Sequence, residues 1–165
     1  MTYAEFLQSK RRQDFAYGQD ISEGNMPSIL FPFQRILVRW ALRKGRSALW
    51  ADTGLGKTFM QLAWAQQIPG RVLILAPLCV GQQTIEHGRQ LGLIIGLHVE
   101  SGEKIEVTNY ERLHQVKADN YQGVVLDESS ILKAFAGKIR SKLIAMFRNT
   151  PYRLCCTATP APNDI

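Results

Sequence analysis

The sequence predicts a three-layer α/β domain built on a mostly parallel sheet, because short apolar runs alternate with longer, more polar segments. The runs have the length of strands and span residues 47–50, 71–76, 93–99, 105–108, 123–126 and 152–156. Strands that alternate with helices form a parallel sheet, since each helix returns the chain to the same edge. The segments long enough for such crossovers are residues 57–68, 80–91, 110–116 and 138–148.

Length and composition fit one folded domain. The chain has 165 residues, of which 45% are hydrophobic and 21% charged. Disordered chains have a lower hydrophobic content, so composition excludes that class. A chain of this length hides roughly 70% of its unfolded surface, so a substantial core is expected. No apolar run approaches the roughly 20 residues that cross a bilayer, and we expect no membrane partner.

The first 30 residues are expected to form a basic helix and a loop ahead of the main domain at residues 31–165. Apolar residues recur at helical spacing within residues 3–17, beside a basic run. Residues 18–32 contain glycine, asparagine and proline, which interrupt regular structure. A second helix is predicted from Phe33, and Gly45 supplies its stop.

The positive charge of the chain has two interpretations. The formal net charge is +6. Basic residues gather in the first part of the sequence: Lys10, Arg11, Arg12, Arg35, Arg39, Arg43, Lys44 and Arg46. Such clusters are typical of surfaces that bind a polyanion such as nucleic acid. They are equally typical of a solvated surface, since net charge governs non-specific binding rather than fold, and composition leaves both open.

The three cysteines favour a reducing compartment. Cys79, Cys155 and Cys156 form no C-x-x-C pair, and the adjacent two lie in an apolar run. Disulfides are rare in the cytosol, where buried thiols stay reduced. We therefore expect a cytoplasmic protein.

The strongest chemical signal is the segment ADTGLGKT at residues 51–58. It follows an apolar run and opens a helical pattern, the strand-loop-helix context that a phosphate-binding loop requires. Gly54 and Gly56 let the backbone approach phosphate oxygens, while N–H groups at the start of the helix point at the anion. Lys57 would reach the terminal phosphates, and Thr58 would ligate magnesium.

The second signal is VVLDE at residues 124–128, an apolar strand that ends in two carboxylates. Ligands of parallel sheets bind beyond the carboxyl ends of the strands. Asp127 would hold magnesium through coordinated water, and Glu128 would orient and deprotonate an attacking water. Alone, such a pair is more often a helix N-cap. Combined with the loop at 51–58, it predicts ATP hydrolysis with magnesium.

These motifs resemble the first RecA-like lobe of a superfamily-two helicase of the DEAD/DEAH type, which is a P-loop NTPase. The resemblance is greatest to the Snf-type translocases and their phage relatives, and it covers about residues 28–163. It implies an ATP-dependent motor, with ATP and magnesium as cofactors and nucleic acid, expected to be DNA, as its partner. If a phage encodes the protein, the host cytoplasm is its compartment.

FPFQ at residues 31–34 resembles the adenine-recognition segment of this family. The resemblance implies that Gln34 contacts the adenine edge, and a side-chain amide can both donate and accept there. The alternative is that Gln34 is a solvated helix residue without a role in binding. The predicted nucleotide-binding residues are Gln34, Asp52, Thr53, Gly54, Leu55, Gly56, Lys57 and Thr58.

Two further segments, residues 73–80 and 107–113, resemble those that meet the nucleic-acid backbone. Pro77, Thr108 and Asn109 are the candidate contact residues, and contacts of this kind position a protein without reading sequence. The alternatives stay open: a buried strand with a proline stop, and a strand that leads into a capped helix.

TATP at residues 157–160 resembles the segment that couples hydrolysis to movement between lobes. The resemblance implies that Thr157 and Thr159 hydrogen-bond toward the acidic pair. A strand end with local threonine-to-backbone bonds is the alternative. Ser130 stands where the family often carries an ionisable coupling residue, and phage relatives resemble this chain there.

In the resembling motors a second RecA-like lobe supplies an arginine finger, and this sequence ends at Ile165 without such a lobe. We therefore expect a second lobe in cis or in trans, and weak turnover without it. The alternative is a nucleotide-dependent nucleic-acid-binding module, or a truncated lobe with little turnover. A small-molecule phosphotransferase is a third possibility, which the acidic pair and TATP disfavour.

Overall fold

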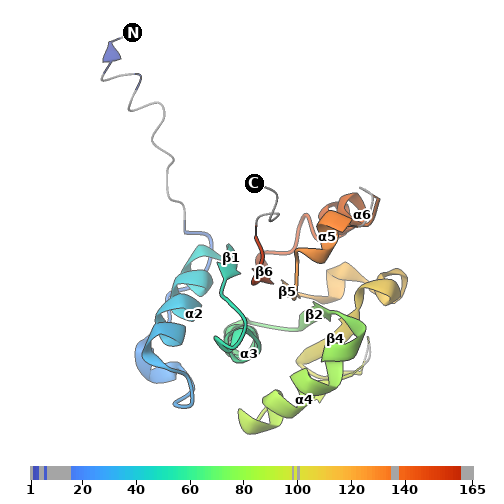
Figure 1. The fold of residues 1–165 in the computed structure, drawn as a ribbon, viewed down its shortest axis with the longest axis horizontal. Coiled ribbons are helices and arrows are strands. Elements are labelled where there is room, and N and C mark those ends of the chain that lie inside the picture. The colour runs from blue at the N-terminus through green and yellow to red at the C-terminus, as the bar shows by residue number, and fades with distance from the viewer. Residues whose placement is uncertain are drawn as a thin grey trace.

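The computed structural model describes residues 2, 3, 6, 16–97, 99, 101–134 and 138–160. Within them a six-stranded parallel sheet lies between two layers of helices, and Figure 1 shows α3 and α4 on one side and α5 and α6 on the other. The strand order is β1-β6-β5-β2-β4-β3. The strands are β1 Arg46–Trp50, β2 Val72–Ala76, β3 Ile95–Gly96, β4 Ile105–Asn109, β5 Gly123–Leu126 and β6 Tyr152–Thr157.

Helices and short 3₁₀ turns connect these strands. The α-helices are α2 Pro32–Lys44, α3 Lys57–Gln67, α4 Gly81–Gln90, α5 Ile131–Ala134 and α6 Lys138–Met146. The 3₁₀ turns are η1 Glu23–Asn25, η2 Leu78–Val80, η3 Tyr110–Gln115 and η4 Ala118–Asn120. The fold class predicted from the sequence is therefore confirmed, and the sheet is parallel throughout.

The centre of the sheet is apolar on both faces. All five residues of β2 are buried, as expected for a strand covered by helices on both sides. One core cluster joins α2, α3 and one face of the sheet, with Trp64 fully buried. A second cluster on the other face includes Leu73, Tyr110, Leu143 and Phe147.

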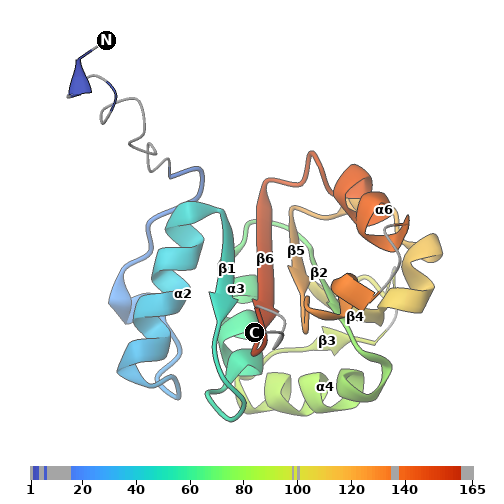
Figure 2. The ribbon, with the colours of Figure 1, turned by 45° about the horizontal axis from the view of Figure 1, so that its top comes forward.

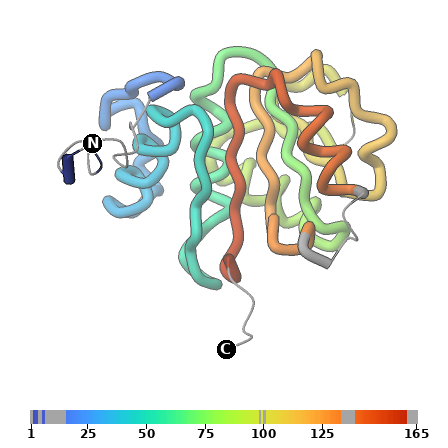
Figure 3. Tube along the Cα trace, turned by 90° about the horizontal axis from the view of Figure 1, so that it is seen from above, coloured from blue at the N-terminus to red at the C-terminus, as the bar shows by residue number. Residues whose placement is uncertain are grey.

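Strand register brings the functional segments to one edge. β2 pairs in parallel with β4, with Ala76 opposite Asn109, and with β5, with Leu75 opposite Leu126. β1 pairs in parallel with β6, with Trp50 opposite Thr157. Figure 2 shows β1 and β6 side by side with their arrowheads pointing the same way, and Figure 3 shows β6 between β1 and β5.

Residues before α2 pack closely against it. Gly18 lies so near the end of this helix that a Cβ atom there would meet the Leu42 carbonyl oxygen at 1.8 Å. Gly45 ends α2 with a φ of +70°, and its N–H donates to Ala41 and Leu42. Met26 and Leu30 belong to the first core cluster.

The structure differs from the sequence prediction in three places. Among the described residues of the strand expected at 93–99, only Ile95–Gly96 form a strand, and a Cβ atom at Gly96 would lie 1.9 Å from Ser101 Oγ. The segment 110–116, expected to be an α-helix, is the 3₁₀ helix η3, which begins where Asn109 Oδ1 accepts from the Arg112 N–H. The short helix α5 was not predicted.

Most of the helix predicted at residues 3–17 lies outside the described residues. In the part of the chain that the structure describes, no helix is long and apolar enough to span a membrane.

Candidate nucleotide site and nucleic-acid interface

The predicted phosphate loop connects β1 to α3, and its backbone depends on two glycines. Gly54 and Gly56 have φ angles of +84° and +74°, a region that other residues rarely adopt. Gly56 is also tightly packed, because a Cβ atom there would lie 2.4 Å from Gln34 Nε2. Asp52 stabilises the turn by accepting the Thr53 N–H at 2.7 Å. Leu55, at the tip of the loop, is exposed.

Lys57 is the first residue of α3 and turns back over the loop. Its Nζ donates to the carbonyl oxygens of Ala51 at 2.9 Å and Asp52 at 3.2 Å. These bonds keep the ammonium group beside the loop rather than in open solvent. Thr58 follows as the second helical residue, half-buried. A positive charge and a hydroxyl group therefore lie together where α3 begins.

Gln34 forms part of a cavity beside the phosphate loop. Its Oε1 accepts the Phe31 N–H at 2.9 Å, and its Nε2 donates to the Leu55 carbonyl at 2.9 Å. The carbonyl and one amide hydrogen of Gln34 are thus in contact with protein, and its side chain links α2 to the loop. The cavity has a volume of about 350 Å³ and is lined by Ile29, Phe31, Phe33, Gln34, Gly54, Leu55, Gly56 and Phe59.

The aromatic side of this cavity suits a flat ligand. The rings of Phe31 and Phe33 are stacked, with centroids 6.2 Å apart and planes 8° from parallel. Both residues are exposed although they are apolar, Phe31 at 65% and Phe33 at 41%. Stacked apolar rings beside an amide group are chemically matched to a nucleobase.

Asp127 comes directly after β5 and is only 8% exposed. Its Oδ1 accepts from Gln61 Nε2 at 2.6 Å, and its N–H donates to the Leu75 carbonyl. Burial raises the pKa of the Asp127 carboxyl, and the hydrogen bond from Gln61, together with the charge of Lys57, opposes that rise. The carboxylate is therefore poorly solvated and would gain from a nearby cation.

Glu128 has a φ of +46°, and it is the one non-glycine residue with positive φ in the described part of the chain. Its Oε1 accepts from Ser130 Oγ at 2.6 Å and from Thr157 Oγ1 at 3.0 Å. The Thr159 N–H donates in turn to Thr157 Oγ1 at 3.1 Å. Ser130 and Thr157 thus touch the acidic pair directly, whereas Thr159 reaches it through Thr157.

The predicted nucleic-acid contact residues meet at the same edge. Pro77 after β2 and Thr108 and Asn109 at the end of β4 line one cavity of about 200 Å³. Thr108 is only 6% exposed, and its Oγ1 has no hydrogen-bond partner within the described structure. Arg112, which the sequence analysis did not single out, also lines this cavity.

Comparisons with solved structures show the fold. The Sulfolobus solfataricus SWI2/SNF2 ATPase core in complex with dsDNA superposes with a TM-score of 0.70 and 23% identity over 88% of this chain. The UvsW helicase from bacteriophage T4 gives 0.67 and 14% identity over 96%. The Pyrococcus furiosus Hef helicase domain gives 0.64 and 20% over 80%. The chain therefore shares the RecA-like fold of these structures.

The chain spans only part of each of these structures, namely 35% of the SWI2/SNF2 core, 61% of the UvsW chain and 33% of the Hef chain. No family model and no curated protein matches its sequence. The similarity to Snf-type proteins and to a phage helicase agrees with the resemblance found in the motifs.

Two residues of the lobe that contact the acidic pair were missed by the sequence analysis. Gln61 is fully buried on α3, one helical turn after Lys57, and a glutamine within an apolar helix face was the available signal. Tyr110 is 3% exposed and donates its hydroxyl to the Asp127 carbonyl oxygen at 2.7 Å. Burial, followed by the charge of Asp127, raises the pKa of Tyr110, so the hydroxyl stays protonated.

Proposed function

We propose that this chain is the ATP-binding lobe of an ATP-dependent nucleic-acid motor, a DNA helicase or translocase that hydrolyses ATP with magnesium. The contact between Gln61 and Asp127 carries the proposal, because it joins the helix after the phosphate loop to the carboxylate after β5. Phosphate transfer needs these two elements side by side. The cytoplasm, of a host cell if a phage encodes the protein, is the proposed compartment.

The residues present fit a nucleotide. Gly54 leaves space for a close approach to phosphate, since a Cβ atom there would meet nothing within 4 Å. Loop N–H groups and the start of α3 would hold the phosphates, with Lys57 as counter-charge. Gln34 and the rings of Phe31 and Phe33 would hold the base. The remaining amide hydrogen of Gln34 is available for that contact.

The residues also fit magnesium. Thr58 and Asp127 offer a hydroxyl and a carboxylate oxygen, the hard ligands that this ion takes from proteins, with water and phosphate completing its shell. Bound magnesium would stabilise negative charge on the phosphate oxygens. This charge would stabilise the ionised form of Asp127, whose pKa is raised by burial.

Glu128 is the proposed general base. A carboxylate can orient a water molecule and accept its proton as the water attacks the terminal phosphate. Ser130 and Thr157 fix the orientation of this carboxylate by donating to the same oxygen. The other oxygen of Glu128 would then face the water. Thr157 and Thr159 lie at the end of β6 and are proposed to relay movement of that strand end to Glu128.

Nucleic acid, proposed to be DNA, would contact Pro77, Thr108 and Asn109. The cavity that these residues line together supports this proposal, because Arg112 also lines it and would bring a positive charge to a phosphate there. A second RecA-like lobe, in cis or in trans, would close the nucleotide site and provide an arginine. An arginine finger raises the rate by about 10³–10⁵-fold, so we expect slow hydrolysis by this lobe alone.

Phosphate release from ATP tests the proposal. The chain would be assayed with magnesium, with and without duplex DNA, and ATP binding would be titrated in parallel by calorimetry. Binding with slow, DNA-stimulated release is the expected result. Binding of ATP and DNA without any release favours the alternative, a nucleotide-dependent nucleic-acid-binding module. Absence of ATP binding would contradict both the proposed motor function and this alternative.

A further inference from the structure

Tyr110 connects the proposed nucleic-acid segment to the acidic pair. It directly follows Thr108 and Asn109, both of which line the cavity at the end of β4. Its ring is packed in the second core cluster, and its hydroxyl crosses to the Asp127 carbonyl oxygen at 2.7 Å. A buried side chain thus spans from one segment to the other.

The carbonyl group that Tyr110 holds belongs to the peptide unit between Asp127 and Glu128. The orientation of that unit sets the backbone of Glu128, whose φ of +46° is uncommon for a residue with a side chain. Such conformations persist where surrounding contacts impose them. The Tyr110 hydroxyl is one of these contacts, and the bond from the Ser129 N–H to the Cys156 carbonyl at 2.8 Å is another.

We propose that Tyr110 is a positioning residue that couples nucleic-acid binding to nucleotide binding. The inference rests on the proposed function. DNA seated against Thr108 and Asn109 immobilises the segment that carries Tyr110, and the hydroxyl then fixes the peptide that bears both carboxylates. Because the acidic pair is then already ordered, the protein loses less conformational entropy when magnesium and ATP bind, and each ligand raises the affinity for the other.

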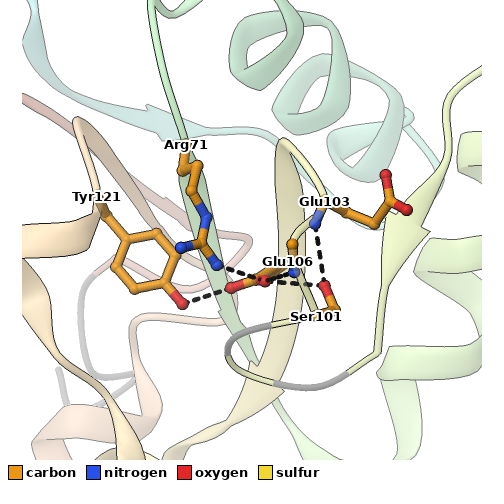
Figure 4. Close-up of polar contacts among 6 residues, drawn as sticks. Arg71, Ser101, Glu103, Glu106 and Tyr121 are labelled. Carbon is orange, nitrogen blue, oxygen red and sulfur yellow. Dashed lines mark hydrogen bonds and ion pairs between the residues drawn. The ribbon is translucent and has the colours of Figure 1, made fainter.

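The chain offers a matched control in Tyr121. Its ring lies in the same core cluster as that of Tyr110 and is 2% exposed. Figure 4 shows its hydroxyl directed at the carboxylate of Glu106, to which it donates at 2.5 Å. Tyr121 precedes β5, at the edge of the sheet opposite Asp127. Removal of this hydroxyl likewise takes one buried hydrogen bond from the same core cluster, but it leaves the acidic pair untouched.

The experiment measures the affinity of a fluorescein-labelled duplex oligodeoxynucleotide with and without ATPγS and magnesium. The unsubstituted chain, Tyr110→Phe and Tyr121→Phe are compared. Positive coupling in the unsubstituted chain is expected to be about 5-fold or more. In Tyr110→Phe the coupling falls to about 1 while each ligand alone still binds, and in Tyr121→Phe the coupling is retained.

Two results would overturn the inference and leave the proposed function standing. In one, Tyr110→Phe retains the coupling; in the other, the unsubstituted chain binds both ligands without coupling. Failure of the unsubstituted chain to bind either ligand overturns the proposed function itself. If Tyr110→Phe does not fold, amide hydrogen exchange of the unsubstituted chain tests the inference instead. The oligonucleotide is expected to slow exchange at residues 127–129, and unchanged exchange there contradicts the inference.

Discussion

The side-chain amide of Gln61 donates to Asp127 Oδ1 at 2.6 Å, from a position one helical turn beyond Lys57. Both side chains are buried, so water does not compete strongly for this bond. Asp127 therefore has its orientation set by a residue of α3. Groups that orient a metal ligand in this way affect metal affinity although they do not touch the metal.

Gln61→Leu is expected to lower the magnesium affinity of the ATP-bound chain by about 10–100-fold. The Asp127 carboxylate loses the hydrogen-bond donor that sets its orientation. Magnesium titrations at fixed ATP would measure the effect. Gln66→Leu, on the same helix, is the control, since Gln66 lies near the end of α3, where its main-chain carbonyl accepts from Lys104 Nζ. Equal magnesium affinity in both variants would show that Gln61 does not contribute to the site.

Lys57→Ala is expected to lower ATP affinity about 10-fold or more, since it deletes the charge placed over a loop of neutral N–H donors. Calorimetric titration with magnesium present would measure it. Lys104→Ala is the matched control, because Lys104 Nζ also donates to a main-chain carbonyl, that of Gln66 at 2.6 Å, but lies away from the loop. Unchanged affinity in Lys57→Ala would contradict the phosphate-loop assignment.

Glu128→Gln is expected to keep ATP binding but to slow hydrolysis by about 10²–10⁴-fold, because an amide has the same shape and cannot accept the proton. Single-turnover measurements, with any partner that raises activity, would separate the two properties. Glu86→Gln, an exposed residue paired with Arg89, serves as control. An undiminished rate in Glu128→Gln would show that another group accepts the proton.

Asp127→Asn is expected to stabilise the lobe at neutral pH when magnesium and nucleotide are absent. Burial raises the folded-state pKa of Asp127 above the ordinary 3.8, so the ionised form destabilises the fold. This penalty is present above the folded pKa and disappears as pH falls below the unfolded value. Denaturant unfolding from pH 7 toward pH 4 should therefore show the gain in Asp127→Asn shrinking. A gain that is independent of pH would exclude ionisation as its cause.

Arg71→Met is expected to destabilise the lobe by about 3 kcal/mol, because it leaves the buried Glu106 carboxylate without its cation. Arg71 Nη2 lies 2.6 Å from Glu106 Oε1, which also accepts from Ser101 Oγ and the Gly102 N–H, as Figure 4 shows in part. The pair lies at the amino end of β4, away from the nucleotide site. ATP affinity measured at a temperature where the variant is folded should be unchanged.

Periodicity and motif context were sufficient to predict the sheet and its main helices. The loop at 51–58 and the pair Asp127–Glu128 could be located because their residue types mark strand ends. Local conformation was harder to predict: residues 110–115 form a 3₁₀ helix that begins at the side-chain cap of Asn109, although their composition permits an α-helix. Such caps depend on side-chain geometry that a residue pattern does not contain.

The contacts behind the acidic pair could not be predicted, for a different reason. Gln61 and Tyr110 reach Asp127 across 66 and 17 residues of sequence, respectively. The packing of α3 on β5 brings Gln61 there, and the order of the strands in the sheet brings Tyr110. Gln34 was predicted at the nucleotide site from a resemblance, and the structure adds its bond to Leu55, which ties α2 to the phosphate loop.

The position of β1 at the edge of the sheet has a consequence for synthesis of the protein. This strand carries the phosphate loop, and it pairs with β6, so Arg46 must find Arg153 more than 100 residues later in the chain. Contacts of such sequence separation form slowly, because a long loop must close before they add stability. As the chain emerges from the ribosome, β1 therefore remains unpaired until β6 has been translated. The phosphate loop, which follows β1, is therefore among the last segments to reach its folded position.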